Sequence, residues 1–171
     1  MDHLSFGTRL GLAAMVILFL AIAYVVLMIS PRAAASAGHL CLAQAVYFEV
    51  RGEPNAGQFG VASVVLSRVA HPAYPDTICE VVFEASTRRN ACQFSFACDS
   101  LSDRAVPGAA WQQSLRVAGQ VLAGLRPDLT GRATHYHALS VDPLWAKDLT
   151  HTVTIGQHRF YHDRSSKLVS R

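Results

Sequence analysis

A glutamate stands in an apolar helical stripe, at a position where the spacing would favour leucine. Leu42 and Val46 define the stripe, and on a helical wheel Glu49 lies about 20° from Leu42, within the same stripe. Burial makes an ionised carboxylate costly, so we expect the pKa of Glu49 to be raised. A general acid that works near neutral pH needs such a pKa. The alternative is a structural ion pair with Arg51, Arg68 or another arginine.

Two other carboxylates could act together with Glu49. Glu53 follows one turn later, beyond Gly52, where its expected role is to cap the next helix. Asp99 closes a segment rich in aromatic residues. A reaction that uses a pair of carboxyl groups needs the second one at a defined distance from the first. Asp99 and Glu53 are the candidates for that second group.

Histidines suggest a competing chemistry. His135 and His137 would share one face of a strand, so two imidazoles could meet one metal ion. A zinc-dependent amidase is therefore the alternative enzyme. The HExxH spacing of many zinc enzymes is absent, and His137 could simply form hydrogen bonds within the sheet. We expect no metal and no cofactor.

The four cysteines all follow the N-terminal apolar run. In an exported domain they predict up to two disulfides, and three connectivities are open. A zinc site would favour paired C-x2-C spacing, which this chain lacks. The disulfide candidates are Cys41, Cys79, Cys92 and Cys98.

Helices are expected in the first part of the exported region. The patterns predict helices over residues 40–51 and 55–69, the second capped by Asn55 and central to the core. Thr77 and Glu80 form a capping box that opens a short helix. A further helix is expected to begin at Pro107, with an apolar stripe made of Trp111, Leu115, Ala118, Leu122 and Leu125.

Short strands are expected later in the chain. Residues 92–98 alternate between polar and apolar types, which predicts a strand, and residues 133–138 predict another. Residues 153–155 and 159–161 should pair across a two-residue turn. Helices followed by short antiparallel strands predict a single α+β domain.

The N-terminal part contains an apolar run at residues 10–29. As a helix this run would rise about 30 Å, the thickness of a bilayer's hydrocarbon core. We expect residues 1–9 to be a flank, 30–38 a tether, 39–165 the catalytic domain and 166–171 a tail. We expect residues 10–29 to anchor the protein in the inner membrane, with the catalytic domain in the periplasm. The alternative is secretion after cleavage near Ala37, because Ala35-Ser36-Ala37 fits a signal peptidase site.

Composition excludes several classes of protein. Hydrophobic residues make up 51% of the chain, so a disordered chain is excluded. The net charge of +3 comes from 15 basic and 12 acidic residues that are scattered along the sequence. This surplus is too weak to indicate a nucleic-acid partner.

A set of motifs resembles the SleB/CwlJ-type cell wall hydrolases. It comprises LAQAVYFEVRGEP at residues 42–54, GQFGVA at 57–62, VVLSRV at 64–69, PDTIC at 75–79, CQFSFACD at 92–99, ATHYH at 133–137 and IGQHRFY at 155–161. Val50 and Ser67 depart from the usual pattern, which has alanine and asparagine at these positions. The resemblance implies a lysozyme- or lytic-transglycosylase-like domain that cleaves peptidoglycan strands between MurNAc and GlcNAc. It also implies that Glu49, the first glutamate of the E-A-R-G-E-type motif, is the catalytic acid and base.

Substrate contacts are expected from aromatic and polar side chains, because sugar rings stack on aromatic faces. The resemblance favours Phe96 and Tyr136 as stacking residues, with Gln93 and Ser95 as polar contacts. A third possibility is a tethered, non-catalytic domain that binds the cell wall. The retained carboxylate at Glu49 argues against it.

Overall fold

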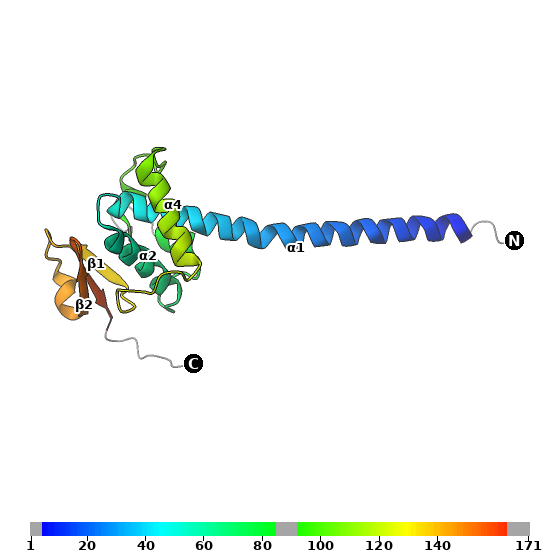
Figure 1. Cartoon of the computed structure of the whole chain (residues 1–171). Helices are drawn as coiled ribbons and strands as arrows, with labels where there is room; N and C mark the ends of the chain where they lie inside the picture. The colour runs from blue at the N-terminus through cyan, green and yellow to red at the C-terminus, as the bar shows by residue number, and fades with distance from the viewer. Residues whose placement is uncertain (1–4, 85–91, 164–171) are drawn as a thin grey trace. The chain divides into compact units, whose positions relative to one another are not determined.

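The computed structural model describes residues 5–84 and 92–163, and within the first helix it leaves the side chains of residues 5–13 and 25–36 undescribed. The chain divides into two compact units, residues 1–37 and 38–171 (Figure 1). Helix α1 (Ser5–Val50) contributes to both. The predicted tail at residues 166–171 and part of the predicted flank at residues 1–9 lie outside the described residues.

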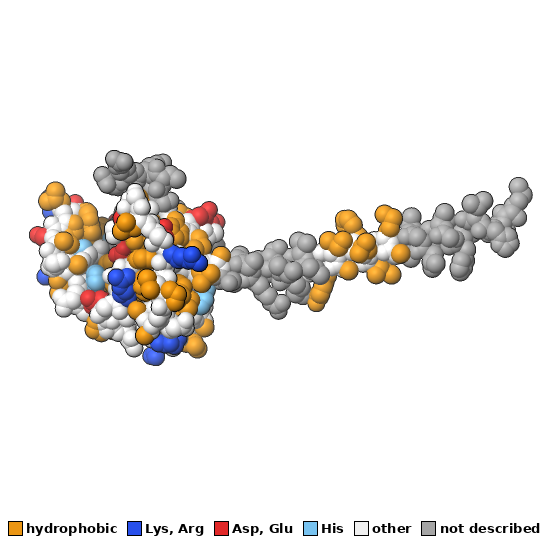
Figure 2. Space-filling model, turned by 90° about the horizontal axis from the view of Figure 1, so that it is seen from above, with side chains coloured by type: hydrophobic (Ala, Val, Ile, Leu, Met, Phe, Trp, Pro, Cys, Tyr) orange, Lys and Arg blue, Asp and Glu red, His pale blue; other side chains and the backbone are white. Residues whose placement is uncertain are grey.

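In the first unit, α1 carries apolar side chains that are exposed at every described position from 14 to 24 except Ala23, which is half-buried (Figure 2). The predicted apolar run at residues 10–29 extends beyond this described stretch on both sides. Among the described residues, no helix is long and apolar enough to cross a membrane.

Two of the predicted helices lie in the first half of the second unit. Helix α1 ends at Val50, one residue before the predicted end, but it is continuous from Ser5, so the predicted start at residue 40 is wrong. Helix α2 (Asn55–Val69) has the predicted bounds. The prediction that Asn55 caps α2 is wrong, because Pro54 occupies the N-cap and gives no side-chain cap. The Asn55 side chain instead accepts a hydrogen bond from Gln113 of the last helix, at 3.1 Å.

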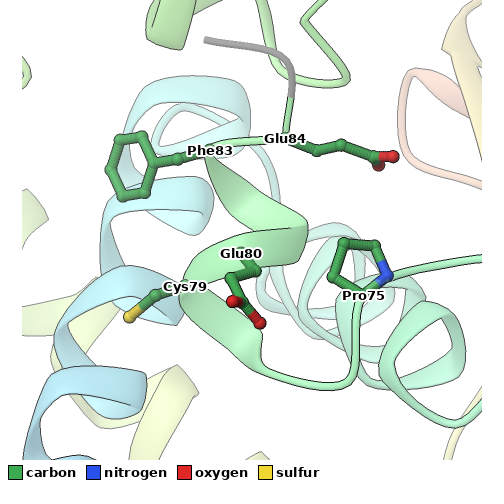
Figure 3. A pocket seen from close by; sticks show the side chains of 5 residues that line it. All are labelled: Pro75, Cys79, Glu80, Phe83 and Glu84. Atoms are coloured by element: carbon green, nitrogen blue, oxygen red, sulfur yellow. The ribbon is translucent and has the colours of Figure 1, made fainter. Parts of the chain in front are cut away.

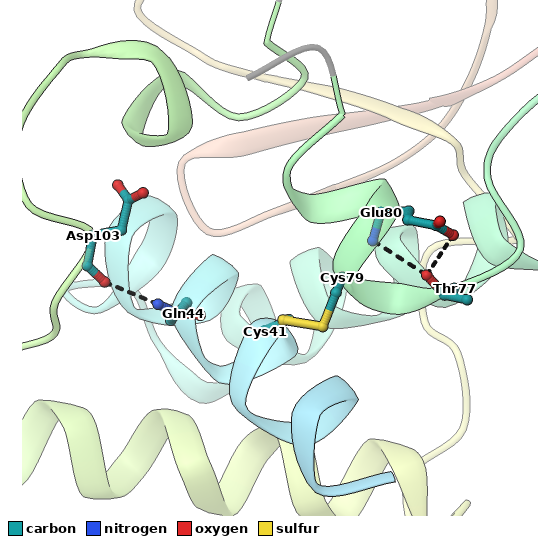
Figure 4. Close-up of a disulfide and its surroundings, with 6 residues drawn as sticks. All are labelled: Cys41, Gln44, Thr77, Cys79, Glu80 and Asp103. Carbon is teal, nitrogen blue, oxygen red and sulfur yellow. Dashed lines mark hydrogen bonds between the residues drawn. A yellow bond between two sulfur atoms is a disulfide. The ribbon is translucent and has the colours of Figure 1, made fainter. Parts of the chain in front are cut away.

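The predicted capping box is confirmed at α3 (Ile78–Val82). The Thr77 hydroxyl oxygen accepts a hydrogen bond from the Glu80 amide, and the Thr77 hydroxyl donates to the Glu80 carboxylate at 2.6 Å. The first contact gives a partner to an amide at the helix start that would otherwise lack one, and the second joins the two side chains. Disulfide Cys41–Cys79 joins α3 to α1 (Figure 4).

Helix α4 (Ala109–Leu122) is present, but its predicted apolar stripe is wrong at the C-terminal end. Leu122 is 39% exposed, and Leu125 is 69% exposed beyond the helix end. Gly124, with a φ of +66°, turns the chain away after the helix, so Leu125 cannot continue the stripe. The side chains that α4 does bury are Ser114, Val117, Ala118 and Val121.

Residues 92–98 do not form the predicted strand. They contain the 3-10 turn η1 (Ser95–Cys98), and disulfide Cys92–Cys98 brings the two Cα atoms to 5.9 Å. Seven extended residues would span about 20 Å, so this disulfide and a strand exclude each other. Alternation of polar and apolar residues here reflects a compact loop that buries Phe94 and Phe96.

The strands form one small antiparallel sheet. Strand β1 (His135–Ala138) lies beside β3 (His158–His162), which lies beside β2 (Thr150–Ile155). The predicted β2–β3 hairpin is confirmed across Gly156-Gln157, and the short turn η2 (Leu144–Asp148) precedes β2. With the helices of this unit, the sheet confirms the α+β class.

The sheet packs on α2 at very short range. A Cβ atom at Gly60 would lie 2.8 Å from the Phe160 ring of β3, so only glycine allows this approach. Farther along α2, Arg68 Nε donates to the Thr134 carbonyl just before β1, at 2.8 Å. These two contacts bring β1 and β3 against the helical core.

Candidate active site

Glu49 lies near the C-terminal end of α1, where the helix meets the sheet. The Tyr136 hydroxyl of β1 donates a hydrogen bond to Glu49 Oε2 at 3.1 Å. The pKa of Glu49 is raised, chiefly because burial disfavours the carboxylate. The Tyr136 hydrogen bond, the Arg68 charge and a hydrogen bond from the Ser95 backbone oppose this rise. The predicted rise in pKa is thus confirmed.

Arg68 is the buried cation of this site. It is 4% exposed, and its guanidinium lies over the rings of Tyr74 and Phe94, at 5.5 and 5.4 Å from their centroids. Burial lowers the pKa of Arg68, which the neighbouring tyrosines and glutamates counteract. The charge of Arg68 favours ionised Glu49, but the effect of burial is larger. The other suggested ion-pair partner, Arg51, lies over the Tyr47 ring at 4.8 Å.

Tyr136 is held rigidly beside Glu49. Its ring packs against His158 and Phe160, with centroids 5.5 and 5.8 Å away. Burial and the neighbouring Glu49 charge raise the pKa of Tyr136 well above that of a free tyrosine. Tyr136 therefore keeps its proton and acts as a hydrogen-bond donor to Glu49.

The two candidate second carboxylates are occupied elsewhere. Glu53 Oε2 accepts a hydrogen bond from the Gln157 amide at 3.0 Å, so the expected capping of α2 by Glu53 is wrong. Asp99 Oδ1 accepts from the Leu101 amide at 2.8 Å in a local turn. Each carboxylate thus accepts a hydrogen bond from a backbone amide in a turn.

Sequence inspection missed a further carboxylate, Glu84. It follows α3, contributes its charge to the environment of Arg68, and has one buried oxygen, Oε2, without a hydrogen-bond partner among the described residues. It also lines an open pocket of about 520 Å³ with Pro75, Cys79, Glu80 and Phe83 (Figure 3). Only the folded chain brings Glu84 near Arg68, and no sequence pattern indicated it.

The aromatic candidates differ in their exposure. Phe96 is 5% exposed and stacks on Phe48 at 4.7 Å, so it belongs to the core and the expectation of an open stacking surface is wrong. Gln93 and Ser95 are exposed on the same loop. Trp145 is 37% exposed beside the sheet.

The paired histidines do share a face, as predicted, and both rings contact Trp145. His137 Nδ1 lies 2.9 Å from the Ala138 carbonyl, which can only accept, so this nitrogen carries the proton. His137 Nε2 then accepts from the Tyr161 hydroxyl at 2.9 Å. Both ring nitrogens are therefore used within the sheet. Within residues 5–84 and 92–163, no cluster of three potential metal-ligating side chains is found.

Comparison with known proteins identifies similar chains. The spore cortex-lytic enzymes of Halalkalibacterium halodurans and Bacillus subtilis are 54% and 51% identical over 43 residues. These matches cover 25% of this chain but only 13% and 14% of the two relatives. The chain thus matches a small part of the length of each.

Two solved structures are similar over most of their length. The SleB catalytic domain of Bacillus cereus is 29% identical with a TM-score of 0.60, covering 72% of this chain and 88% of that one. The catalytic domain of the germination-specific lytic transglycosylase SleB from Bacillus anthracis is 30% identical, again with a TM-score of 0.60, covering 72% and 93%. The family model for cell wall hydrolases matches residues 52–161, beginning three residues after Glu49. The chain therefore belongs to the cell wall hydrolase family.

Proposed function

We propose that this protein is a lytic transglycosylase that cleaves peptidoglycan strands between MurNAc and GlcNAc, with Glu49 as general acid and base. One observation carries the proposal: Glu49 is a half-buried carboxyl with a raised pKa that receives a hydrogen bond from Tyr136. Such a group is protonated at a higher pH than an ordinary glutamate, as a general acid requires. The similarity to a lytic transglycosylase catalytic domain agrees with this chemistry.

The reaction needs two proton transfers at Glu49, one out and one in. Protonated Glu49 donates to the glycosidic oxygen, and the bond from MurNAc C1 to that oxygen breaks. The resulting carboxylate takes the proton of the MurNAc C6 hydroxyl, whose oxygen bonds to C1 and forms a 1,6-anhydro ring. Glu49 is then protonated again, and no water is consumed. Tyr136 and Arg68 stabilise the carboxylate between the two transfers.

The contacts of the two predicted second carboxylates support transglycosylation over hydrolysis. Hydrolysis requires a second carboxylate about 5–5.5 Å away for retention, or about 6.5–9.5 Å away for inversion. Glu53 and Asp99, the two predicted candidates, each accept a backbone hydrogen bond in a turn. Intramolecular closure by the C6 hydroxyl needs only Glu49.

Purified sacculi test the proposal directly. The wild-type protein should release soluble muropeptides, and this release should persist in EDTA. Glu49→Gln should fold but release at least about 100-fold less, the usual contribution of a general acid. Loss of activity in EDTA with full activity of Glu49→Gln would instead support the histidine-dependent amidase. Binding to sacculi without any soluble product from the wild type would support a non-catalytic wall-binding domain.

We also propose that residues 10–29 anchor the enzyme in the inner membrane, with its catalytic domain in the periplasm. The exposed apolar side chains of α1 would then face lipid, and the two disulfides suit an oxidising compartment. Full-length protein should stay in the membrane fraction after alkaline carbonate extraction. A protein that is released and begins near Ala37 would instead indicate a cleaved signal peptide.

A further inference from the structure

Glu53 connects two turns that lie 104 residues apart in the chain. It follows the end of α1, and its Oε2 atom accepts the hydrogen bond of the Gln157 amide in the β2–β3 turn. The Glu53 side chain is half-buried. Glu53 thereby joins the helical part of the domain to the sheet.

The surrounding chain holds Glu53 in place from both sides. The Glu53 amide donates to the Val50 carbonyl, and the Glu53 carbonyl accepts from the buried Gln58 side chain, each at 2.9 Å. The Glu53 backbone is thus fixed, and its carboxylate has little freedom to leave the hairpin turn.

Glycines make room for this carboxylate. A Cβ atom at Gly156 would overlap the Glu53 carboxylate, and Gly156 has a φ of +58°, which other residues rarely adopt. On the helical side, a Cβ at Gly57 would lie 3.3 Å from the Glu53 Cβ atom. Both positions allow the two turns to approach as closely as the hydrogen bond requires.

The hairpin that Glu53 holds supports the candidate catalytic pair. Strand β3 begins just after Gln157, and its Phe160 is the partner of Tyr136 in β1. Tyr136 in turn donates its hydrogen bond to Glu49. We propose that Glu53 is a positioning residue, which sets the sheet against α1 so that Tyr136 meets Glu49. This inference rests on the proposed function of Glu49.

Two substitutions at Glu53 distinguish positioning from acid–base chemistry. Glu53→Gln keeps an oxygen that can accept from the Gln157 amide, so it should retain at least about a third of the wild-type kcat on glycan strands. Glu53→Ala loses the contact, so its kcat should fall by roughly 10- to 100-fold with a smaller change in KM. If Glu53→Gln is as inactive as Glu49→Gln, the ionised carboxylate of Glu53 takes part in the reaction, and the proposal is overturned. Full activity of Glu53→Ala would also overturn the proposal.

Hydrogen exchange at the Gln157 amide tests the contact without using activity. Exchange should be slow in the wild type and Glu53→Gln, and faster in Glu53→Ala and Gly156→Ala. Equal protection in all four proteins would overturn the inference even if glycan cleavage is observed. If none of the proteins, including the wild type, cleaves glycan, the proposed function fails, whereas the exchange pattern still decides whether Glu53 holds the hairpin.

Discussion

At the scale of single residues, the site depends on opposing effects on Glu49. Burial favours the neutral acid, whereas Tyr136, Arg68 and the Ser95 backbone favour the carboxylate. Burial is the larger effect, so the pKa of Glu49 is raised, and a general acid that must give and take a proton needs a pKa closer to the working pH than that of an ordinary glutamate. The spacing of apolar residues singled out Glu49 as a carboxyl with a raised pKa, and the resemblance to a known family added its catalytic role. Its partner Tyr136 lies 87 residues away, so only the fold brings the two together.

Tyr136→Phe should shift the pH dependence of activity. The Tyr136 hydroxyl stabilises ionised Glu49, so its removal should raise the pKa of Glu49 further. The decline of kcat/KM at high pH, where the general acid loses its proton, should therefore move to higher pH. Tyr161→Phe is the matched control, because the Tyr161 hydroxyl binds His137. A shift to lower pH in Tyr136→Phe, or an equal shift in both variants, would contradict this account.

Glu49→Gln should change how stability depends on pH. The pKa of Glu49 in the folded state is raised above its ordinary value of 4.5. Its stabilising contribution is therefore complete below pH 4.5 and is lost as pH rises through the folded-state pKa. Glutamine does not ionise, so the variant should gain free energy of unfolding relative to the wild type as pH rises. Denaturant titrations between acid and neutral pH measure this difference, and a constant difference would refute it.

At the scale of elements, the close contact of α2 with β3 sets the distance between helices and sheet. The ends of helices could be predicted where the sequence has residues that stop a helix, as at Gly52 and Pro54, or a capping motif, as before α3. The loop at residues 92–98 could not be predicted. Its polar and apolar residues alternate as in a strand, but the Cys92–Cys98 disulfide excludes a strand there. The role of Glu53 was missed for a similar reason, since its partner lies in a distant turn.

Gly60→Ala tests the contact between α2 and β3. Its new Cβ would lie 2.8 Å from the Phe160 ring, which is fully buried and has little room to move. Overpacking of this kind costs about 1–3 kcal/mol, and the better helix propensity of alanine offsets up to about 1 kcal/mol. We expect a net loss in the free energy of unfolding, measured by denaturant titration. Gly119→Ala in α4 is the control, because Gly119 is also inside a helix and its new Cβ would make an ordinary van der Waals contact, 3.5 Å from His39 Nε2. Equal stability of Gly60→Ala and wild type would contradict the close packing.

At the scale of the whole molecule, the two disulfides stabilise the catalytic unit to different extents. Cys41–Cys79 closes a loop with a sequence separation of 38 and ties α1 to α3, whereas Cys92–Cys98 spans a separation of 6. Longer loops lose more entropy when they are closed in the unfolded chain. The sequence predicted the cysteines as disulfide partners but left their pairing open, since pairing follows from the packing of helices.

Replacing each disulfide by a pair of serines should reveal this difference. The Cys41→Ser/Cys79→Ser protein should lose about 2–4 kcal/mol of unfolding free energy, and the Cys92→Ser/Cys98→Ser protein should lose less. Thermal and denaturant unfolding of both variants measure the order. A larger loss for the Cys92–Cys98 pair would mean that the loop around η1 contributes native contacts beyond chain entropy.

The central claim is that Glu49 cleaves glycan strands by transferring a proton to the leaving oxygen and from the C6 hydroxyl. Mass spectrometry of products released from purified peptidoglycan tests it most directly, because anhydro, reducing and peptide ends differ in mass. The account predicts 1,6-anhydro-MurNAc ends from the wild type and almost no product from Glu49→Gln. Reducing ends, cleaved stem peptides, or anhydro ends at wild-type yield from Glu49→Gln would contradict it.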